Sequence, residues 1–337
     1  MKYRKLGRTG LNVSYIGFGG IPLAGLDEED ASRVLNATLD AGINFIDTAR
    51  GYRQSETLIG KSISNRRSEF ILATKTKARD KQKILEELET SLSCLRTERI
   101  DLYQIHYVNK VDELSGVLSK GGALEVLKSI REKGTIRYIG ITGHDARVLL
   151  KAAQTGEFDT VQGAFSYIEK NQKIIDLINY CAENDIGFIV QKPLAGGAIT
   201  SVRAGLKWIL NYPVSTVIPG MLSTNQVMEN AEVGDMDLKL TDGEKMELDT
   251  IARNLDRYFC RRCYYCHDSC PEGIRIGVVL EFFGKAKISE NLSLMQKWYN
   301  GMEVNASRCT ACGLCLQECP YELPIIDMLR EAHELLK

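Results

Sequence analysis

The sequence has little net charge and no long apolar run. Its 337 residues include 43 Lys and Arg and 44 Asp and Glu, for a formal net charge of −1. A chain so balanced lacks the electrostatic signature of nucleic-acid or membrane-surface binding. No apolar stretch approaches the ~20 residues of a membrane span, and the first residues are not followed by the apolar segment of a signal peptide. We therefore expect a cytoplasmic protein with no nucleic-acid or membrane partner.

Proline and tryptophan are also scarce, with 7 and 2 residues, which excludes a proline-rich low-complexity chain. With 44% hydrophobic residues the chain has the composition of a globular protein, and its length predicts a large domain plus a smaller one. Cysteine, with 10 residues, is not scarce, and eight of these lie after residue 259. Clustered cysteines in a cytoplasmic protein are more often metal ligands than disulfides.

The eight C-terminal cysteines form two runs that match C-x-x-C-x-x-C-x-x-x-C-P at every position. Three thiolates at this spacing can bind three irons of one 4Fe–4S cubane, and in two-cluster ferredoxins the fourth comes from the other run. On that pattern one cluster is bound by Cys260, Cys263, Cys266 and Cys319, and the other by Cys309, Cys312, Cys315 and Cys270. A pair of zinc sites is the alternative, but zinc ribbons use pairs of cysteines.

The rest of the C-terminal segment supports a small domain over residues 256–337. Residues 274–306, between the two runs, read as two short helices whose apolar faces cover the clusters. His267 lies inside the first run and is read as a neighbour of the cluster, not a ligand. Cys94 and Cys181 lie outside both runs and are read as small core residues.

Residues 1–255 alternate short apolar runs with amphipathic stretches after a predicted hairpin at Tyr3–Val13. Eight strands are predicted, at Tyr15–Gly19, Asn44–Thr48, Phe70–Lys75, Leu102–His106, Tyr138–Thr142, Thr160–Ala164, Gly187–Gln191 and Ser215–Pro219. Helical patterns separate them, for example at Glu28–Asp40, Lys83–Leu95, Leu124–Lys133, Ile174–Asn184 and Thr224–Ala231. Eight such units in about 250 residues predict an α/β fold, a closed (β/α)8 TIM barrel. An open doubly wound sheet is the alternative, but the glycines at 17–20 lack the spacing of a dinucleotide fingerprint.

Four polar residues stand at or just after the ends of successive predicted strands, where barrel enzymes collect catalytic groups. They are Asp47, Tyr52, Lys75 and His106. A hydride added to a carbonyl carbon leaves an alkoxide that needs a proton, and tyrosine can supply it. A neighbouring lysine is expected to lower the tyrosine pKa, an aspartate to hold the lysine, and a histidine to orient the substrate oxygen.

These motifs resemble the aldo-keto reductase family. The resemblance covers roughly residues 1–250 and is carried by three segments, Asp47-Thr48-Ala49-Arg50-Gly51-Tyr52, Ala73-Thr74-Lys75 and Asp101-Leu102-Tyr103-Gln104-Ile105-His106. With its cysteine-rich tail the chain is similar to the subgroup that carries a fused 4Fe–4S dicluster domain of ferredoxin type. The resemblance implies a TIM barrel, a nicotinamide cofactor and reversible reduction of aldehydes or ketones.

The resemblance also implies a set of cofactor-binding residues after the barrel strands. They are Thr142, Gln162, Gln191, Pro193, Leu194, Gly196, Gly220, Gln226, Glu229 and Asn230. Gln191 stands where many members have an aromatic residue that stacks on the nicotinamide. Gly220 and Asn225 or Gln226 stand where NADP-preferring members commonly have cations, so NAD is slightly favoured over NADP.

The expected function is an NAD(P)-dependent oxidoreductase that interconverts a small carbonyl compound and an alcohol. Its two 4Fe–4S clusters then serve electron transfer or redox control. Besides the small-molecule substrate, a redox partner protein is therefore expected. Two alternatives stay open at this stage: an electron-transfer module that serves a partner protein, and clusters that are purely structural. The absence of a flavin motif weighs against the first, because hydride transfer moves two electrons together and a cluster accepts one.

Overall fold

The computed structural model describes residues 1–337 except 256–258, 262–265, 268, 289–291 and 320. Within the described residues the chain forms two compact units, Met1–Asp249 and Thr250–Lys337. The expected domain boundary after residue 255 falls at the end of α10 (Asp242–Leu255), the helix that crosses from one unit to the other. No described helix has the length and apolar character needed to cross a membrane.

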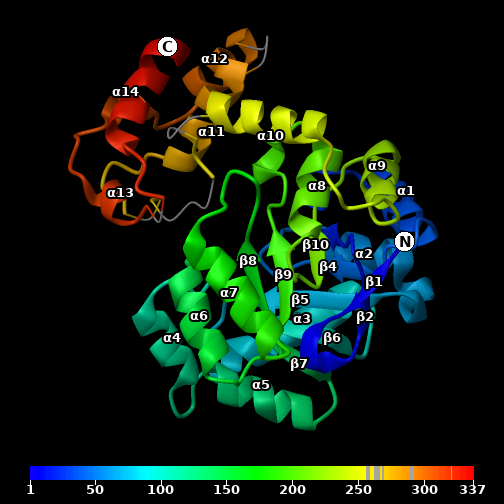
Figure 1. The fold of residues 1–337 in the computed structure, drawn as a ribbon. Coiled ribbons are helices and arrows are strands. Elements are labelled where there is room, and N and C mark those ends of the chain that lie inside the picture. Colours follow the sequence, from blue (N-terminus) through cyan, green and yellow to red (C-terminus); the bar gives the residue numbers. More distant parts are fainter. Residues whose placement is uncertain (256–258, 262–265, 268, 289–291, 320) are drawn as a thin grey trace. The chain divides into compact units, whose positions relative to one another are not determined.

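The first unit is built around eight parallel strands, each paired with the next along the chain (Figure 1). They are β3 (Phe18–Gly19), β4 (Phe45–Asp47), β5 (Ile71–Thr76), β6 (Ile100–Ile105), β7 (Ile136–Thr142), β8 (Thr160–Ala164), β9 (Gly187–Gln191) and β10 (Thr216–Ile218). The first and last strands also meet: the amide of Gly17 donates to the carbonyl of Val217 at 2.7 Å, and that of Gly19 to Pro219 at 2.9 Å. The barrel predicted from the sequence is confirmed, and the open sheet is excluded.

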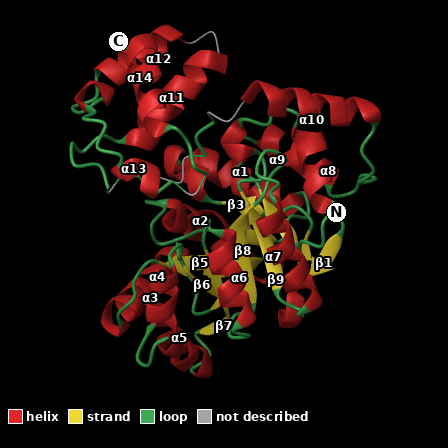
Figure 2. Cartoon of the chain, turned by 60° about the vertical axis from the view of Figure 1, so that its left-hand side comes forward, coloured by secondary structure: helices red, strands yellow, loops and turns green. Residues whose placement is uncertain are grey.

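Helices surround this sheet and bury one apolar face each against it (Figure 2). They are α1 (Glu28–Asp40), α2 (Ser55–Ile63), α3 (Lys81–Leu95), α4 (Val111–Leu118), α5 (Ala123–Glu132), α6 (Ala146–Gln154), α7 (Gln172–Glu183), α8 (Val202–Leu210) and α9 (Thr224–Val233). The start of α1 shows the local cause: the Asp27 carboxylate caps the free amide of Asp30 at 2.8 Å, and acids fill the first turn.

The predicted N-terminal hairpin forms as β1 (Tyr3–Lys5) and β2 (Asn12–Ser14), which pair antiparallel. Leu6 and Val13 from this hairpin share a buried cluster with apolar residues that point into the barrel, such as Phe45 and Leu102. The hairpin therefore closes the end of the barrel where the strands begin. The polar site must then lie at the other end, where the strands finish.

After the end of α10, the described part of the second unit holds four α-helices. They are α11 (Ile276–Ile288), α12 (Leu292–Asn300), α13 (Leu314–Gln317) and α14 (Ile325–Leu336). The first two are the helices expected between the cysteine runs. Their buried side chains, Val279 and Met295 among them, form one apolar core that also contains Cys266 and Cys315. The cysteine runs therefore lie against the core of their own unit.

Candidate active site

Asp47, Tyr52, Lys75 and His106 come together at the end of the barrel where the strands finish. Asp47 is the last residue of β4, Lys75 is the penultimate residue of β5, and His106 directly follows β6. Tyr52 lies in the turn between β4 and α2. Parallel neighbouring strands carry these residues, so their side chains converge although they are up to 59 positions apart in the sequence.

Lys75 and Asp47 form a fully buried ion pair. The Nζ of Lys75 donates to Oδ2 of Asp47 at 2.6 Å and to the carbonyl oxygen of Thr48 at 2.7 Å. Their side chains are 0% and 2% exposed. Burial lowers the pKa of Lys75 and raises the pKa of Asp47, while their mutual attraction opposes both shifts. The lysine is thus locked in place, with the proton held in a short hydrogen bond.

The Tyr52 ring lies between this pair and His106. The Nζ of Lys75 is 5.2 Å from the Tyr52 ring centroid, and the His106 ring centroid is 5.7 Å away in an edge-on arrangement. Burial, followed by the negative charge of Asp47, raises the pKa of Tyr52 above its ordinary value. The expectation that Lys75 lowers this pKa is therefore wrong here, because desolvation and the carboxylate outweigh the ammonium. The phenol stays protonated and can donate.

His106 is held neutral. It is 8% exposed, and burial together with the positive charges of Lys75 and Lys77 lowers its pKa well below the ordinary value. Its Nδ1 is buried and has no hydrogen-bond partner among the described residues. A neutral imidazole beside the Tyr52 phenol can orient a carbonyl oxygen through one ring nitrogen.

Gln104 is a site residue that the sequence reasoning missed. It is fully buried, and its Nε2 donates to Oδ1 of Asp47 at 3.2 Å and to Oε1 of Gln162 at 3.0 Å. It therefore connects the ion pair to a predicted cofactor-binding residue. The sequence contained a signal for Gln104. It precedes His106 by two positions along an extended segment, so both side chains face the same side.

The predicted cofactor residues occupy two regions. Thr142 and Gln162 face each other across β7 and β8, and both are buried at the barrel's end. The remaining ones lie on or after β9 and β10: Gln191, Pro193, Leu194, Gly196, Gly220, Gln226, Glu229 and Asn230.

Side-chain contacts define this second region. The Nε2 of Gln191 donates to the carbonyl of Gly143 at 2.9 Å, so Gln191 is fixed against the loop after β7. The Oε1 of Gln226 accepts from the amide of Leu222 at 2.7 Å. Glu229 is exposed whereas Asn230 is 4% exposed, so these adjacent residues face different surroundings. The cofactor roles of these residues stay predictions.

In the second unit, Cys315 lies among the cysteines expected to share its cluster. Burial and the charges of Cys309, Cys312 and Cys270 raise the pKa of the Cys315 thiol to about 11. These four are the ligand set expected for one cluster, with Cys270 contributed by the other run. Of the other expected set, Cys263 lies outside the described residues. His267 is engaged otherwise, since its Nε2 accepts from the amide of Gly277 at 2.9 Å.

The donor set fits 4Fe–4S cubanes, because each cysteine run supplies thiolates at the spacing at which a cubane presents a different iron to each ligand. Among the described residues, which do not include Cys263, no three His, Cys, Asp or Glu side chains form a group that could hold a single metal ion.

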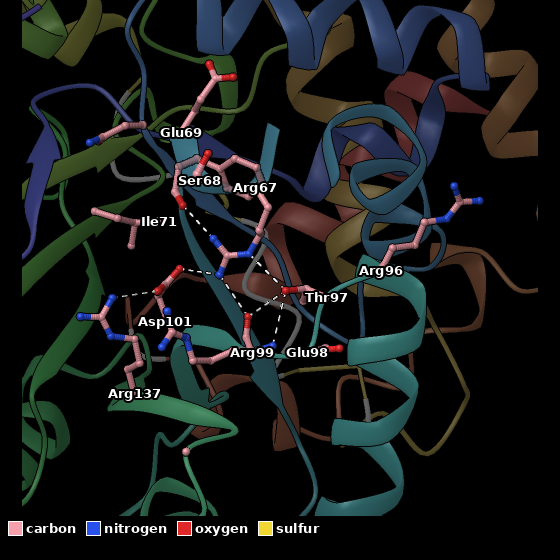
Figure 3. Close-up of a pocket in the computed structure, with 13 residues that line it drawn as sticks. Arg67, Ser68, Glu69, Ile71, Arg96, Thr97, Glu98, Arg99, Asp101 and Arg137 are labelled. Atoms are coloured by element: carbon pink, nitrogen blue, oxygen red, sulfur yellow. Dashed lines mark hydrogen bonds and ion pairs between the residues drawn. The ribbon is translucent and has the colours of Figure 1, made fainter. Parts of the chain in front are cut away.

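A second polar region lies at the opposite end of the barrel, around the starts of β5, β6 and β7. It is an open cavity of about 880 Å³, and the side chains of Arg67 and Arg137 point to Asp101 from two sides (Figure 3). Asp101 is 4% exposed and accepts from Arg67 at 2.6 Å, from Arg137 at 3.3 Å and from the amide of Leu72 at 3.0 Å. Polar networks at this end of a barrel stabilise the fold and do not catalyse.

We expect Asp101→Asn to lower the free energy of unfolding by about 2–3 kcal/mol, because two guanidinium groups lose their buried counter-ion. Urea unfolding followed by circular dichroism measures this. Glu98→Gln, at an exposed residue that lines the same cavity, is the control. Equal unfolding midpoints for both variants would contradict a structural role of Asp101.

Comparison with known proteins agrees with this geometry. The chain is 30% identical over 219 residues to the aldo-keto reductase YhdN of Bacillus subtilis, an alignment that spans 59% of this chain and 64% of that protein. It is 27% identical over 230 residues to the NADH-specific methylglyoxal reductase of Escherichia coli, spanning 59% and 69%. The holo form of aldo-keto reductase AKR11C1 from Bacillus halodurans superposes with a TM-score of 0.65 at 26% identity, covering 75% of this chain and 96% of that one.

Two family models match separate parts of the sequence. Residues 259–323 match the 4Fe-4S dicluster domain, which includes both cysteine runs. Residues 15–205, more than half of the chain, match the model of the aldo/keto reductase family, and they contain the buried ion pair, Tyr52 and His106. The chain is thus an oxidoreductase that belongs to the aldo/keto reductase family and carries a 4Fe–4S dicluster domain after its barrel.

Proposed function

We propose that this protein reversibly reduces a small aldehyde or ketone to an alcohol with NAD(P)H. The observation that carries the proposal is the grouping of a protonated Tyr52 and a neutral His106 beside the buried Lys75–Asp47 pair. The dicluster domain, over residues 256–337, is proposed to hold two 4Fe–4S clusters. Turnover of an aldehyde and ketone panel, followed as NADH or NADPH oxidation under anaerobic conditions, tests it.

The nicotinamide cofactor, when bound, supplies a hydride to the carbonyl carbon. The carbonyl π bond breaks, and the oxygen takes one proton, so that RCHO, NAD(P)H and H⁺ become RCH₂OH and NAD(P)⁺. Tyr52 is placed to give that proton, since its phenol stays protonated. His106 directs the carbonyl oxygen towards Tyr52, and the buried Lys75–Asp47 pair packs beside the Tyr52 ring and fixes its position.

The residues proposed to bind the nicotinamide carry groups that suit it. Gln162 is buried in the middle of β8, and its Oε1 accepts from Gln104. An amide in this position has hydrogen-bonding groups to offer a carboxamide. Since Gln104 also donates to Asp47, it would position the cofactor-binding amide and the ion pair together.

We expect NADH to bind at least as well as NADPH. The site proposed for the 2′-phosphate offers the side-chain-free Gly220 and the amide of Gln226, which already accepts from Leu222. Arg203, a cation that could reach the region, pairs with Glu232 at 2.6 Å. Gly220, Gln226 and Arg203 therefore offer a 2′-phosphate no fixed counter-charge, and Lys192, just after β9, is the other cation in the region.

Fluorescence titration of both nucleotides measures this preference. Asn225→Arg, on the exposed first turn of α9, should shift it towards NADPH, whereas Asn179→Arg on the exposed face of α7 should not. A hundredfold preference of the unaltered protein for NADPH would contradict the proposal. The Escherichia coli relative is named as an NADH-specific reductase, which agrees with this proposal.

We propose that the clusters either carry electrons to a redox partner protein or control the redox reaction in the barrel. Cys312 supports this, since it is exposed while Cys315 is buried, so one edge of that ligand set reaches the surface. Paramagnetic resonance after anaerobic addition of NADH or substrate tests the coupling. Unchanged cluster signals with both would favour a purely structural role.

A further inference from the structure

Three side chains extend the site outward from His106. Lys77 follows the end of β5, Tyr107 follows His106, and His144 lies just after β7. The Tyr107 ring centroid is 6.3 Å from that of His106 and 6.0 Å from that of His144. The Nζ of Lys77 is 4.9 Å from the Tyr107 ring centroid. A lysine ammonium thus lies one aromatic ring beyond the residue proposed to orient the carbonyl oxygen.

A second cation lies close by. The guanidinium of Arg79 donates to the carbonyl oxygens of Lys77 at 2.9 Å, Ala78 at 3.3 Å and His106 at 2.7 Å. These contacts attach the loop that contains Lys77 to the end of β6. They hold the guanidinium half-buried with carbonyl partners only, so its charge is not neutralised by them.

The carboxylates of Glu113 and Glu87 act on the Arg79 guanidinium and oppose the lowering of its pKa by burial, but neither forms an ion pair with it. Oε2 of Glu87 accepts from Thr76 Oγ1 at 2.5 Å, and Oε2 of Glu113 accepts from the amides of Asn109 and Lys110 at 2.8 and 3.3 Å. Within the described part of the chain neither Lys77 nor Arg79 forms an ion pair. An exposed lysine is ordinarily only solvated, but here two cations share the catalytic edge, and the fields of both reach the His106 imidazole.

We propose that the substrate is a small carbonyl compound with an anionic group, a carboxylate or a phosphate monoester, that Lys77 binds while Tyr52 and His106 hold the carbonyl oxygen. The inference rests on the proposed carbonyl reduction. Arg79 is a positioning residue, whose charge adds to the field but whose hydrogen bonds go to the backbone. Lys77 contributes as a point charge, and because it contacts the substrate away from the reacting atoms it should act on KM more than on kcat.

The experiment compares anionic and neutral carbonyl compounds of similar size. One pair is 4-oxobutanoate with butanal, and the other is glyceraldehyde 3-phosphate with glyceraldehyde. For each pair we take the ratio of kcat/KM for the anionic member to kcat/KM for the neutral member. We expect Lys77→Met to lower one ratio by about tenfold, mainly through KM, and Lys77→Arg to restore part of it. The pair whose ratio falls identifies the anionic group. Lys81→Met, an exposed lysine in the first turn of α3, is the matched control.

A second measurement separates this inference from the proposed function. Calorimetric binding of succinate or glycerol 3-phosphate, with NAD⁺ saturating so that the nucleotide phosphate site is filled, requires no turnover. Binding that is lost in Lys77→Met supports the anion site even if no carbonyl is reduced. If neutral carbonyls are reduced and the ratios of anionic to neutral kcat/KM are equal in the unaltered protein and in Lys77→Met, the inference is wrong. The proposed function would then still stand.

Discussion

Replacing Tyr52 by phenylalanine should reduce kcat for carbonyl reduction by two or more powers of ten, because the alkoxide loses its positioned proton donor. The ring itself remains, so packing between Lys75 and His106 is kept. Nucleotide affinity, measured by fluorescence titration, should not change. Lys75→Met would be a less specific test, since it also leaves the buried Asp47 without its counter-ion.

The pH dependence of kcat gives the Tyr52 prediction a second readout. Burial and Asp47 raise the pKa of Tyr52, so reduction should show no loss from tyrosine ionisation up to the ordinary tyrosine pKa of about 10. Tyr180→Phe, which alters a half-buried tyrosine on the outer helix α7, is the control and should keep full activity. If Tyr52→Phe reduced the substrate at the rate of the unaltered protein, the proposed proton donor would be wrong.

Replacing one cluster cysteine should remove a whole cluster. We expect the anaerobically purified protein to contain about eight irons and eight sulfides per chain, and Cys315→Ser to retain about half of them. Cys315 lies in the apolar core of the second unit, so loss of its cluster should also destabilise that unit. Iron and acid-labile sulfide analysis, with thermal unfolding, measures both effects.

Cys94→Ser is the matched control for the metal analysis. Cys94 lies on α3 in the first unit and accepts a long contact, 3.5 Å, from Arg50. It should leave iron and sulfide contents unchanged. About two zinc ions per chain without visible absorption in the unaltered protein would show that the cysteine runs hold zinc.

Most of the barrel could be predicted from the sequence because its signals are local. The strands Thr160–Ala164 and Gly187–Gln191 and the helix Glu28–Asp40 have the predicted bounds, since apolar runs and caps such as Asp27 act within a few residues. The strand predicted over Tyr15–Gly19 is shorter, Phe18–Gly19, and the backbone of Tyr15 and Gly17 before it bonds across the barrel's closure to Val217. That contact joins the two ends of the sheet, and no local pattern encodes it.

The sequence by itself determined the chemical inventory: two complete cysteine runs at cluster spacing, and Asp47, Tyr52, Lys75 and His106 at the ends of successive strands. Only the tertiary structure decided what surrounds these groups. It placed Gln104 between Asp47 and Gln162, and it reversed the expected pKa shift of Tyr52 by burying the phenol near a carboxylate. It also set Lys77 over Tyr107, a residue of the next strand's loop. The physical reason is that residue identity and spacing specify which groups a chain carries, whereas desolvation and charge act through space between strands far apart in the sequence.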